Sequence, residues 1–171
     1  MSWAIHSHSA DSSDFKAQSS VGRNVQDANM LLEAGILQQK NHDLEGADRT
    51  YRRVLELDPQ NKYAWYNLGV IAHGDGRAVD ARVAYDKALK VDPAFPPALF
   101  NEALLLEPSD PDRAAGLLKR VIADNPKAGT AYLHLGRIWE QKNRDDKAAA
   151  EFRRAIATDP SLRSQVPKEF R

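Results

Sequence analysis

The chain has 171 residues, about one domain's length on the usual expectation of roughly 100–200 residues per domain. Its 24 basic and 24 acidic side chains cancel, so no global positive field favours nucleic acid or an anionic membrane surface. The lack of cysteine excludes disulfides, thiolate nucleophiles and sulfur metal ligands, and no stretch approaches the roughly 20 apolar residues that cross a bilayer. We therefore expect no membrane insertion by this chain and a cytoplasmic location; the soluble domain of an anchored or exported protein fits the same sequence.

Residues 1–27 differ in composition from the rest of the chain. Serine is frequent there and aliphatic side chains are few, so the segment has little apolar surface to bury. This composition predicts a polar leader that is partly flexible. Its larger apolar residues, Trp3, Ile5 and Phe15, could still dock elsewhere on the protein.

From Ala28 onward the chain is periodic. Four prolines recur at intervals of 34, 33 and 34 residues, at Pro59, Pro93, Pro126 and Pro160. An alanine precedes each proline by twelve residues, at Ala47, Ala81, Ala114 and Ala148, and a large side chain follows four residues after it, at Tyr51, Tyr85, Leu118 and Phe152. A small residue holds the matching upstream position, at Gly35, Gly69, Ala103 and Gly136. The pattern divides the chain into four repeats, 28–61, 62–95, 96–128 and 129–162, followed by a short tail, 163–171.

Each repeat is predicted to form two amphipathic helices, over 28–41 and 44–57 in the first repeat. The small residues let the two backbones approach closely, and the large ones fill the space between repeats. Proline ends each second helix because it lacks the N–H donor and disfavours the helical state of the residue before it. Asn41-His42, Gly74–Gly76 and Asn143 are turn residues that tolerate left-handed conformations.

These spacings resemble the tetratricopeptide repeat, in which W-x2-L-G, A-x3-F and a closing proline mark a helix–turn–helix of 34 residues. The segments Trp65–Gly69 (WYNLG) and Tyr132–Gly136 (YLHLG) are close to its first-helix pattern. The resemblance covers residues 28–162 and implies an all-α fold, an α-α superhelix (solenoid) of helix–turn–helix repeats.

Two features depart from the regular pattern. The third repeat is one residue short, and Pro108 in its turn is expected to end the first helix early. After the last repeat, Leu162, Val166 and Phe170 could fold back over the helix that carries Phe152. If they do not, that end presents an exposed apolar face.

The resemblance implies that the first helices line a concave surface, which we expect to be the binding site. Equivalent positions of the first helices give the candidate groove residues Leu32, Ile36, Tyr66, Asn67, Val70, Phe100, Asn101, Leu104, Leu133, His134 and Arg137. Most are apolar, and exposed apolar surface of this kind marks binding sites. Asn67 and Asn101 offer both a donor and an acceptor to the backbone of an extended peptide. The leader is a second candidate occupant of this groove.

The sequence therefore predicts a protein–protein interaction module or scaffold that binds a partner peptide in an apolar groove. The alternative is a structural, self-associating element, a weak homodimer formed through an uncapped C-terminal face. We identify no nucleophile–base pair, no phosphate-binding glycine loop and no metal-ligand spacing, so we expect no enzyme and no cofactor. The basic residues by which some family members grip a terminal carboxylate have no match at Leu32, Ile36 and Pro97. An apolar or helical peptide is the better expectation.

Overall fold

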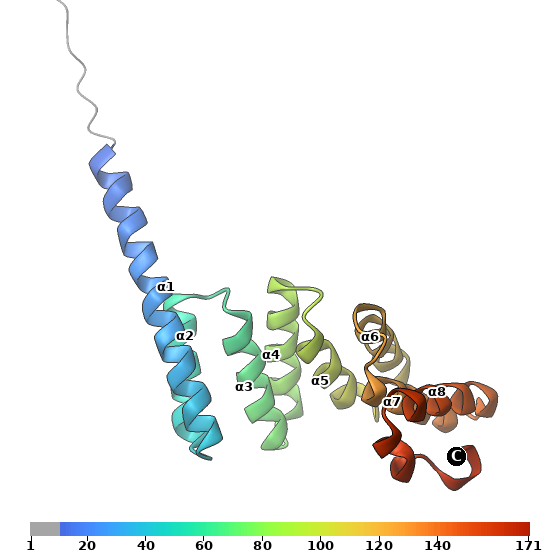
Figure 1. Ribbon diagram of the computed structural model, residues 1–171. Coiled ribbons are helices and arrows are strands. Elements are labelled where there is room, and N and C mark those ends of the chain that lie inside the picture. The colour runs from blue at the N-terminus through green and yellow to red at the C-terminus, as the bar shows by residue number, and fades with distance from the viewer. Residues whose placement is uncertain (1–10) are drawn as a thin grey trace, which may run out of the picture. The chain divides into compact units, whose positions relative to one another are not determined.

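The computed structural model describes residues 11–171; for residues 11–21 and Arg23 it describes the backbone alone. The described chain is helical and contains no strand, as the sequence predicts (Figure 1). In chain order its α-helices are α1 (Asp11–Lys40), α2 (Leu44–Leu57), α3 (Lys62–Gly74), α4 (Ala78–Val91), α5 (Pro96–Leu106), α6 (Pro111–Asp124), α7 (Gly129–Gln141) and α8 (Asp145–Thr158). Two 3₁₀ helices follow, η1 (Pro160–Gln165) and η2 (Lys168–Phe170). Consecutive helices pack in pairs, which confirms the helix–turn–helix repeats.

Residues through Ala64 and residues from Trp65 onward form two compact units. In the first unit α1 packs against α2 and is much longer, 30 residues against 14 (Figure 1). The sequence predicts this helix only from about residue 28, because the apolar periodicity begins there. Burial does begin where expected, since residues 24–27 are exposed and Ala28 is fully buried. The helix nevertheless starts earlier, at Asp11, and no proline lies between these positions to interrupt it.

Glycine on a first helix and an aromatic ring on the second form the closest contact within a repeat. A β-carbon added to Gly35 would lie only 2.6 Å from Cε1 of Tyr51, closer than side-chain packing allows. The same approach recurs at 2.5 Å between Gly69 and Tyr85 and at 2.6 Å between Gly136 and Phe152. All three rings are fully buried. The predicted role of the small residues is therefore confirmed.

The ends of the helices also follow the sequence. Each second helix has 14 residues and stops one residue before the Asp-Pro or Asn-Pro pair, at Leu57, Val91, Asp124 and Thr158. His42 and Asn143 adopt left-handed backbone conformations with φ of 62° and 53° in their turns. In the third repeat α5 ends at Leu106 after 11 residues, whereas α3 and α7 have 13. Pro108 ends this helix early, as predicted.

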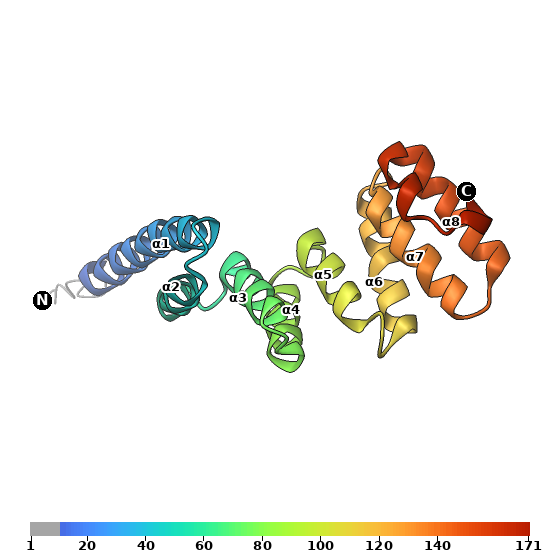
Figure 2. The same ribbon diagram turned by 90° about the horizontal axis from the view of Figure 1, so that it is seen from below.

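The C-terminal segment folds back over the last helix pair (Figure 2). Leu162 and Val166 are buried in one apolar cluster with Phe152, and the rings of Phe152 and Phe170 lie 5.2 Å apart. Of the two arrangements that the sequence left open, fold-back is therefore the one observed. The uncapped apolar face required by the alternative homodimer is covered, because these three side chains occupy it.

Candidate functional site

In the second unit, eight of the predicted groove residues lie on the first helices α3, α5 and α7. We call them the first-helix row: Tyr66, Asn67, Val70, Phe100, Asn101, Leu104, His134 and Arg137. Every member is half-buried. A half-buried side chain is held in place by its neighbours and still offers surface to a partner. The row thus has the exposure that binding would need.

Tyr66 of α3 joins the first two helices of the row. Its hydroxyl accepts a hydrogen bond of 3.1 Å from the Nδ2 amide of Asn101 on α5, and its ring meets Phe95 edge to face at 5.5 Å. Burial raises the pKa of Tyr66, and the bond from Asn101 opposes this shift. The sequence predicts Asn101 as a ligand for a peptide backbone. In the structure one of its two amide donors is already used to position Tyr66.

Phe100 of α5 and His134 of α7 join the next two helices. Their rings lie edge to face with centroids 5.8 Å apart. The Nδ1 atom of His134 lies 2.8 Å from Oε2 of Glu107, the residue that follows α5. His134 is therefore held on two sides. The contacts of Tyr66 with Asn101 and of Phe100 with His134 connect three successive first helices through members of the row.

Leu133 does not belong to an accessible surface, which corrects the sequence prediction. Its side chain is only 1% exposed and packs in the same cluster as Leu162 and Val166. The C-terminal segment occupies the space that the predicted groove would need there. In the first unit, Leu32 is half-buried and Ile36 is exposed, together with Met30 and Leu37 on the same helix.

The leader residues that could fill the groove fall outside what the structure describes. Trp3 and Ile5 precede the described chain, and Phe15 lies where only the backbone of α1 is described. An occupant of the first-helix row drawn from the leader therefore stays a prediction.

One buried carboxylate was not predicted from the sequence. Glu102 on α5 is fully buried and contacts the guanidinium of Arg113, which also reaches Asp86 at 3.2 Å. A signal was present, because the corresponding residues of the second and fourth repeats are Leu68 and Leu135. The first repeat has Ala34 there, so glutamate at a position that is otherwise apolar marks the third repeat as chemically different.

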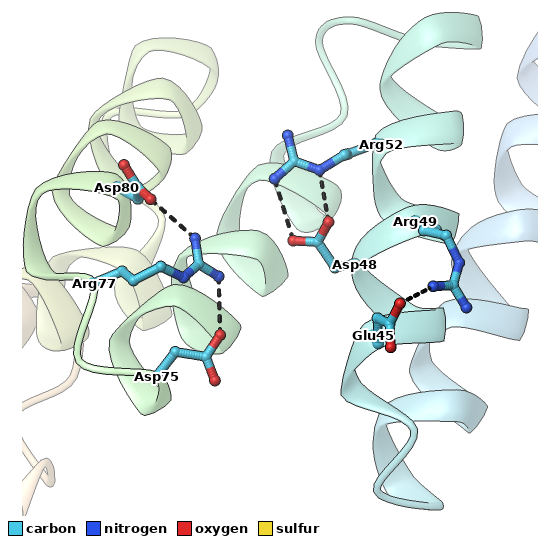
Figure 3. A network of polar contacts seen from close by, with 7 residues as sticks. All are labelled: Glu45, Asp48, Arg49, Arg52, Asp75, Arg77 and Asp80. Carbon is cyan, nitrogen blue, oxygen red and sulfur yellow. Dashed lines mark hydrogen bonds and ion pairs between the residues drawn. The ribbon is translucent and has the colours of Figure 1, made fainter.

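Arginines on α2 and in the turn before α4 are paired with neighbouring acids. On α2, Arg52 contacts Asp48 at 2.6 Å and Arg49 contacts Glu45 at 2.5 Å (Figure 3). In the turn before α4, Arg77 reaches Asp75 at 3.0 Å and Asp80 at 2.9 Å, and these acids raise its pKa (Figure 3). Such exposed pairs contribute little to stability. They do neutralise the arginines, so these segments present no basic stripe of the kind that nucleic acid needs.

Among the residues that the structure describes, no helix is long and apolar enough to span a membrane. These residues also contain no group of three or more His, Cys, Asp or Glu side chains placed to hold a metal ion.

Comparison with known proteins agrees with this geometry. A family model described as tetratricopeptide repeat matches residues 32–99 and 103–162. A probable UDP-N-acetylglucosamine–peptide N-acetylglucosaminyltransferase, SPINDLY of Solanum lycopersicum, is 34% identical over 76 residues, 44% of this chain and 8% of that protein. The human protein O-mannosyl-transferase TMTC3 is 28% identical over 138 residues, 77% of this chain and 15% of that protein. This chain thus spans a small fraction of either relative.

Solved structures show the same fold. The crystal structure of MamA superimposes with a TM-score of 0.73 at 18% identity, covering 94% of this chain and 99% of that one. At this identity the likeness concerns the fold alone. It supports the superhelical solenoid of helix–turn–helix repeats.

Proposed function

The chain belongs to the tetratricopeptide repeat family, and on that basis we propose that it binds a peptide segment of a protein partner along the first-helix row. Repeat proteins of this kind present extended surfaces that mediate protein–protein interaction. The observation that carries the proposal is the continuity of the row. Tyr66, Asn101, Phe100 and His134 form contacts from α3 through α5 to α7.

The composition of the row suits a peptide with apolar side chains. Val70, Phe100 and Leu104 offer apolar surface, and Tyr66 adds an aromatic ring with a polar tip. Aromatic side chains are typical anchors of interfaces because they bury large areas with few rotatable bonds. Asn67 retains both donor and acceptor chemistry for a peptide backbone.

The contacts within the row reduce the cost of binding. Tyr66 is already oriented by Asn101, and His134 by Phe100 and Glu107. Side chains that are ordered before binding lose less conformational freedom when the partner arrives. We expect an affinity near 1 µM, which corresponds to about −8 kcal/mol.

The test is selection of peptides from a displayed random library on the full chain, followed by affinity measurement of a selected peptide on variants. Phe100→Ala and Leu104→Asp should each weaken binding at least about tenfold, since they remove or charge the centre of the row. Val79→Asp is the matched control, because Val79 is 71% exposed on the second helix α4 and lies outside the row.

Circular dichroism must show the same helical content in all three variants. Binding that survives both row substitutions, or that is lost equally in Val79→Asp, would contradict the proposal. Nothing in this experiment depends on knowing the natural partner beforehand.

A further inference from the structure

A second site lies away from the first-helix row. A pocket of about 510 Å³ opens between the second helices α4 and α6, with one residue of α5 in its wall. Its lining consists of Asp86, Leu89, Lys90, Glu102, Arg113, Gly116, Leu117 and Arg120. The volume falls in the range of roughly 300–1,000 Å³ that small ligands and anchoring side chains occupy.

The charges of this pocket are separated along the helices. Asp86, Glu102 and Arg113 form one end, because Arg113 contacts both carboxylates. Lys90 lies one turn further along α4, and Arg120 is placed beyond that helix by its bond to the carbonyl of Pro93. Two carboxylates share one guanidinium at the first end, whereas the second end carries two cations. The middle is apolar, formed by Leu89 and Leu117.

Glu102 places a buried carboxyl group with one unpartnered oxygen at the first end. Its Oε1 atom contacts Arg113, but its buried Oε2 atom has no hydrogen-bond partner. Buried polar atoms without partners are rare in native proteins and call for an explanation. Burial raises the pKa of Glu102 most, and the neighbouring Asp86 raises it further by its charge and by a side-chain hydrogen bond, while Arg113 and Arg82 oppose the shift. Asp86, whose side chain is 41% exposed, is the carboxylate of this end that a ligand ammonium can reach.

Gly116 keeps the middle of the pocket open. It lies inside α6, where glycine weakens a helix relative to alanine. Packing does not require glycine there, because an added β-carbon would meet nothing within 4 Å. The matching positions of the other repeats hold Arg49, Val83 and Ala150. The third repeat therefore combines a buried carboxylate and an open helix surface that its sister repeats lack.

We propose that this pocket binds a zwitterionic group, an ammonium and a carboxylate joined by a short aliphatic stem, such as the lysine at the C-terminus of a partner polypeptide. The ammonium binds Asp86 above Glu102, the stem lies on Leu89 and Leu117, and the carboxylate binds Lys90 and Arg120. Complementary charge at both ends fixes the direction in which the ligand lies.

The length of the ligand is similar to the spacing of Asp86 and Lys90 along α4. Asp86 and Lys90 are separated by one helical turn, a rise of about 6 Å. In a C-terminal lysine the carboxylate and the ε-ammonium are separated by five carbon atoms. The same spacing occurs in 6-aminohexanoate, which lacks the α-amino group and is therefore the probe for the site.

The experiment titrates the full chain with 6-aminohexanoate and follows backbone amide shifts by NMR. We expect saturable shifts at residues that line the pocket, and binding at least about tenfold tighter than that of hexanoate or hexylamine, because each of these satisfies one end only. Equal binding of all three compounds, or no saturable shift at the pocket, would overturn the proposal.

Two variants test the ends separately. Glu102→Leu gives the third repeat the residue of the second and fourth repeats and should lower the affinity for 6-aminohexanoate at least about tenfold, as should Arg120→Gln. Asp80→Asn is the matched control, because it removes a carboxylate from α4 outside the pocket. Unchanged affinity in a folded Glu102→Leu variant would contradict the role of the carboxylate end.

Peptides distinguish the source of the ligand. A peptide that ends in lysine should bind, whereas the same peptide with an amidated C-terminus should lose at least about tenfold in affinity because it lacks the carboxylate. Equal binding of both peptides would refute recognition of the C-terminus. Phe100→Ala should leave the titration unchanged, which separates this site from the first-helix row.

Discussion

The third and fourth repeats build the same helix pair with different side chains. In the fourth repeat Gly136 faces the ring of Phe152 so closely that a β-carbon would lie 2.6 Å from it. In the third repeat the small position holds Ala103, one methyl group larger, and the large position holds Leu118, which is smaller than phenylalanine. Both pairs are fully buried. The residues at the two positions therefore depend on each other. Where the first helix carries alanine in place of glycine, the second helix carries leucine in place of phenylalanine.

The same two repeats differ in polarity. Leu135 in α7 is buried in an apolar cluster, whereas its counterpart Glu102 in α5 is buried with an unpartnered oxygen. Packing explains the apolar residue directly. It does not explain the carboxylate, which is why we assign a binding role to its surroundings.

The largest effect is expected from truncating the ring. Phe152→Ala should lower the free energy of unfolding by about 3–5 kcal/mol, because it removes a fully buried ring and leaves a cavity. Leu118→Ala in the third repeat should cost less, since fewer buried atoms are lost. Urea unfolding followed by circular dichroism measures both. A greater loss at Leu118 would show that the third repeat, and not the fourth, depends more on this contact.

Adding one methyl group tests the tight approach itself. Gly136→Ala should destabilise the protein by about 1–3 kcal/mol, because the new β-carbon must displace a ring that has no free space. Ala103→Gly is the reciprocal change in the third repeat; it should cost about 1 kcal/mol through helix propensity and lost burial. An unchanged free energy of unfolding for Gly136→Ala in the urea experiment would mean that the ring of Phe152 moves aside at little cost.

Replacing the buried carboxylate should have a smaller effect of opposite sign. Glu102→Leu should raise the free energy of unfolding by about 1 kcal/mol at neutral pH, because it removes an unpartnered buried acceptor. Burial and Asp86 raise the pKa of Glu102 above its usual 4.5. The stability that a carboxyl group of this kind contributes is fully present below pH 4.5 and is lost as the pH rises through the pKa of the folded state.

The advantage of Glu102→Leu should therefore grow as the pH is raised from below 4.5 to neutrality. Urea unfolding of both proteins at several pH values gives this difference directly. A difference that is independent of pH would show that the pKa of Glu102 is the same in the folded and unfolded protein.

The smallest effect concerns the open glycine of the third repeat. Gly116→Ala should stabilise the protein by about 0.5–1 kcal/mol, since alanine favours the helix and its β-carbon meets no neighbour. Thermal unfolding detects a change of this size. Destabilisation would indicate that the added β-carbon does meet a neighbouring atom at Gly116.

Local patterns made much of this fold predictable. The bounds of α2 and the stops before the prolines follow from residues that are near in sequence and recur in all four repeats. The glycine–ring contacts follow from residues that recur in three of them. The early start of α1 was missed because its first turns carry no apolar periodicity. The burial of Leu133 was missed for a different reason. It depends on Leu162 and Val166, which lie about thirty residues further along the chain.

The repeat register placed the residues of the first-helix row on α3, α5 and α7, where the structure has them, while their role in binding stays a prediction. It does not reveal that Asn101 is engaged by Tyr66, because side-chain partners depend on rotamers and not on register. Glu102 could have been found by aligning the repeats with one another, where it is the one acid at a position held otherwise by Leu68, Leu135 and Ala34.

The paired constraint between the small and the large position is tested most directly by a double-mutant cycle on Gly136→Ala and Phe152→Leu, which together give the fourth repeat the residues of the third. Each single change should lower the free energy of unfolding. Because the two residues are in contact, the loss in the double variant should be smaller than the sum of the two single losses by at least about 1 kcal/mol. If the two losses simply add, the positions are independent, and the account of how these repeats pack is wrong.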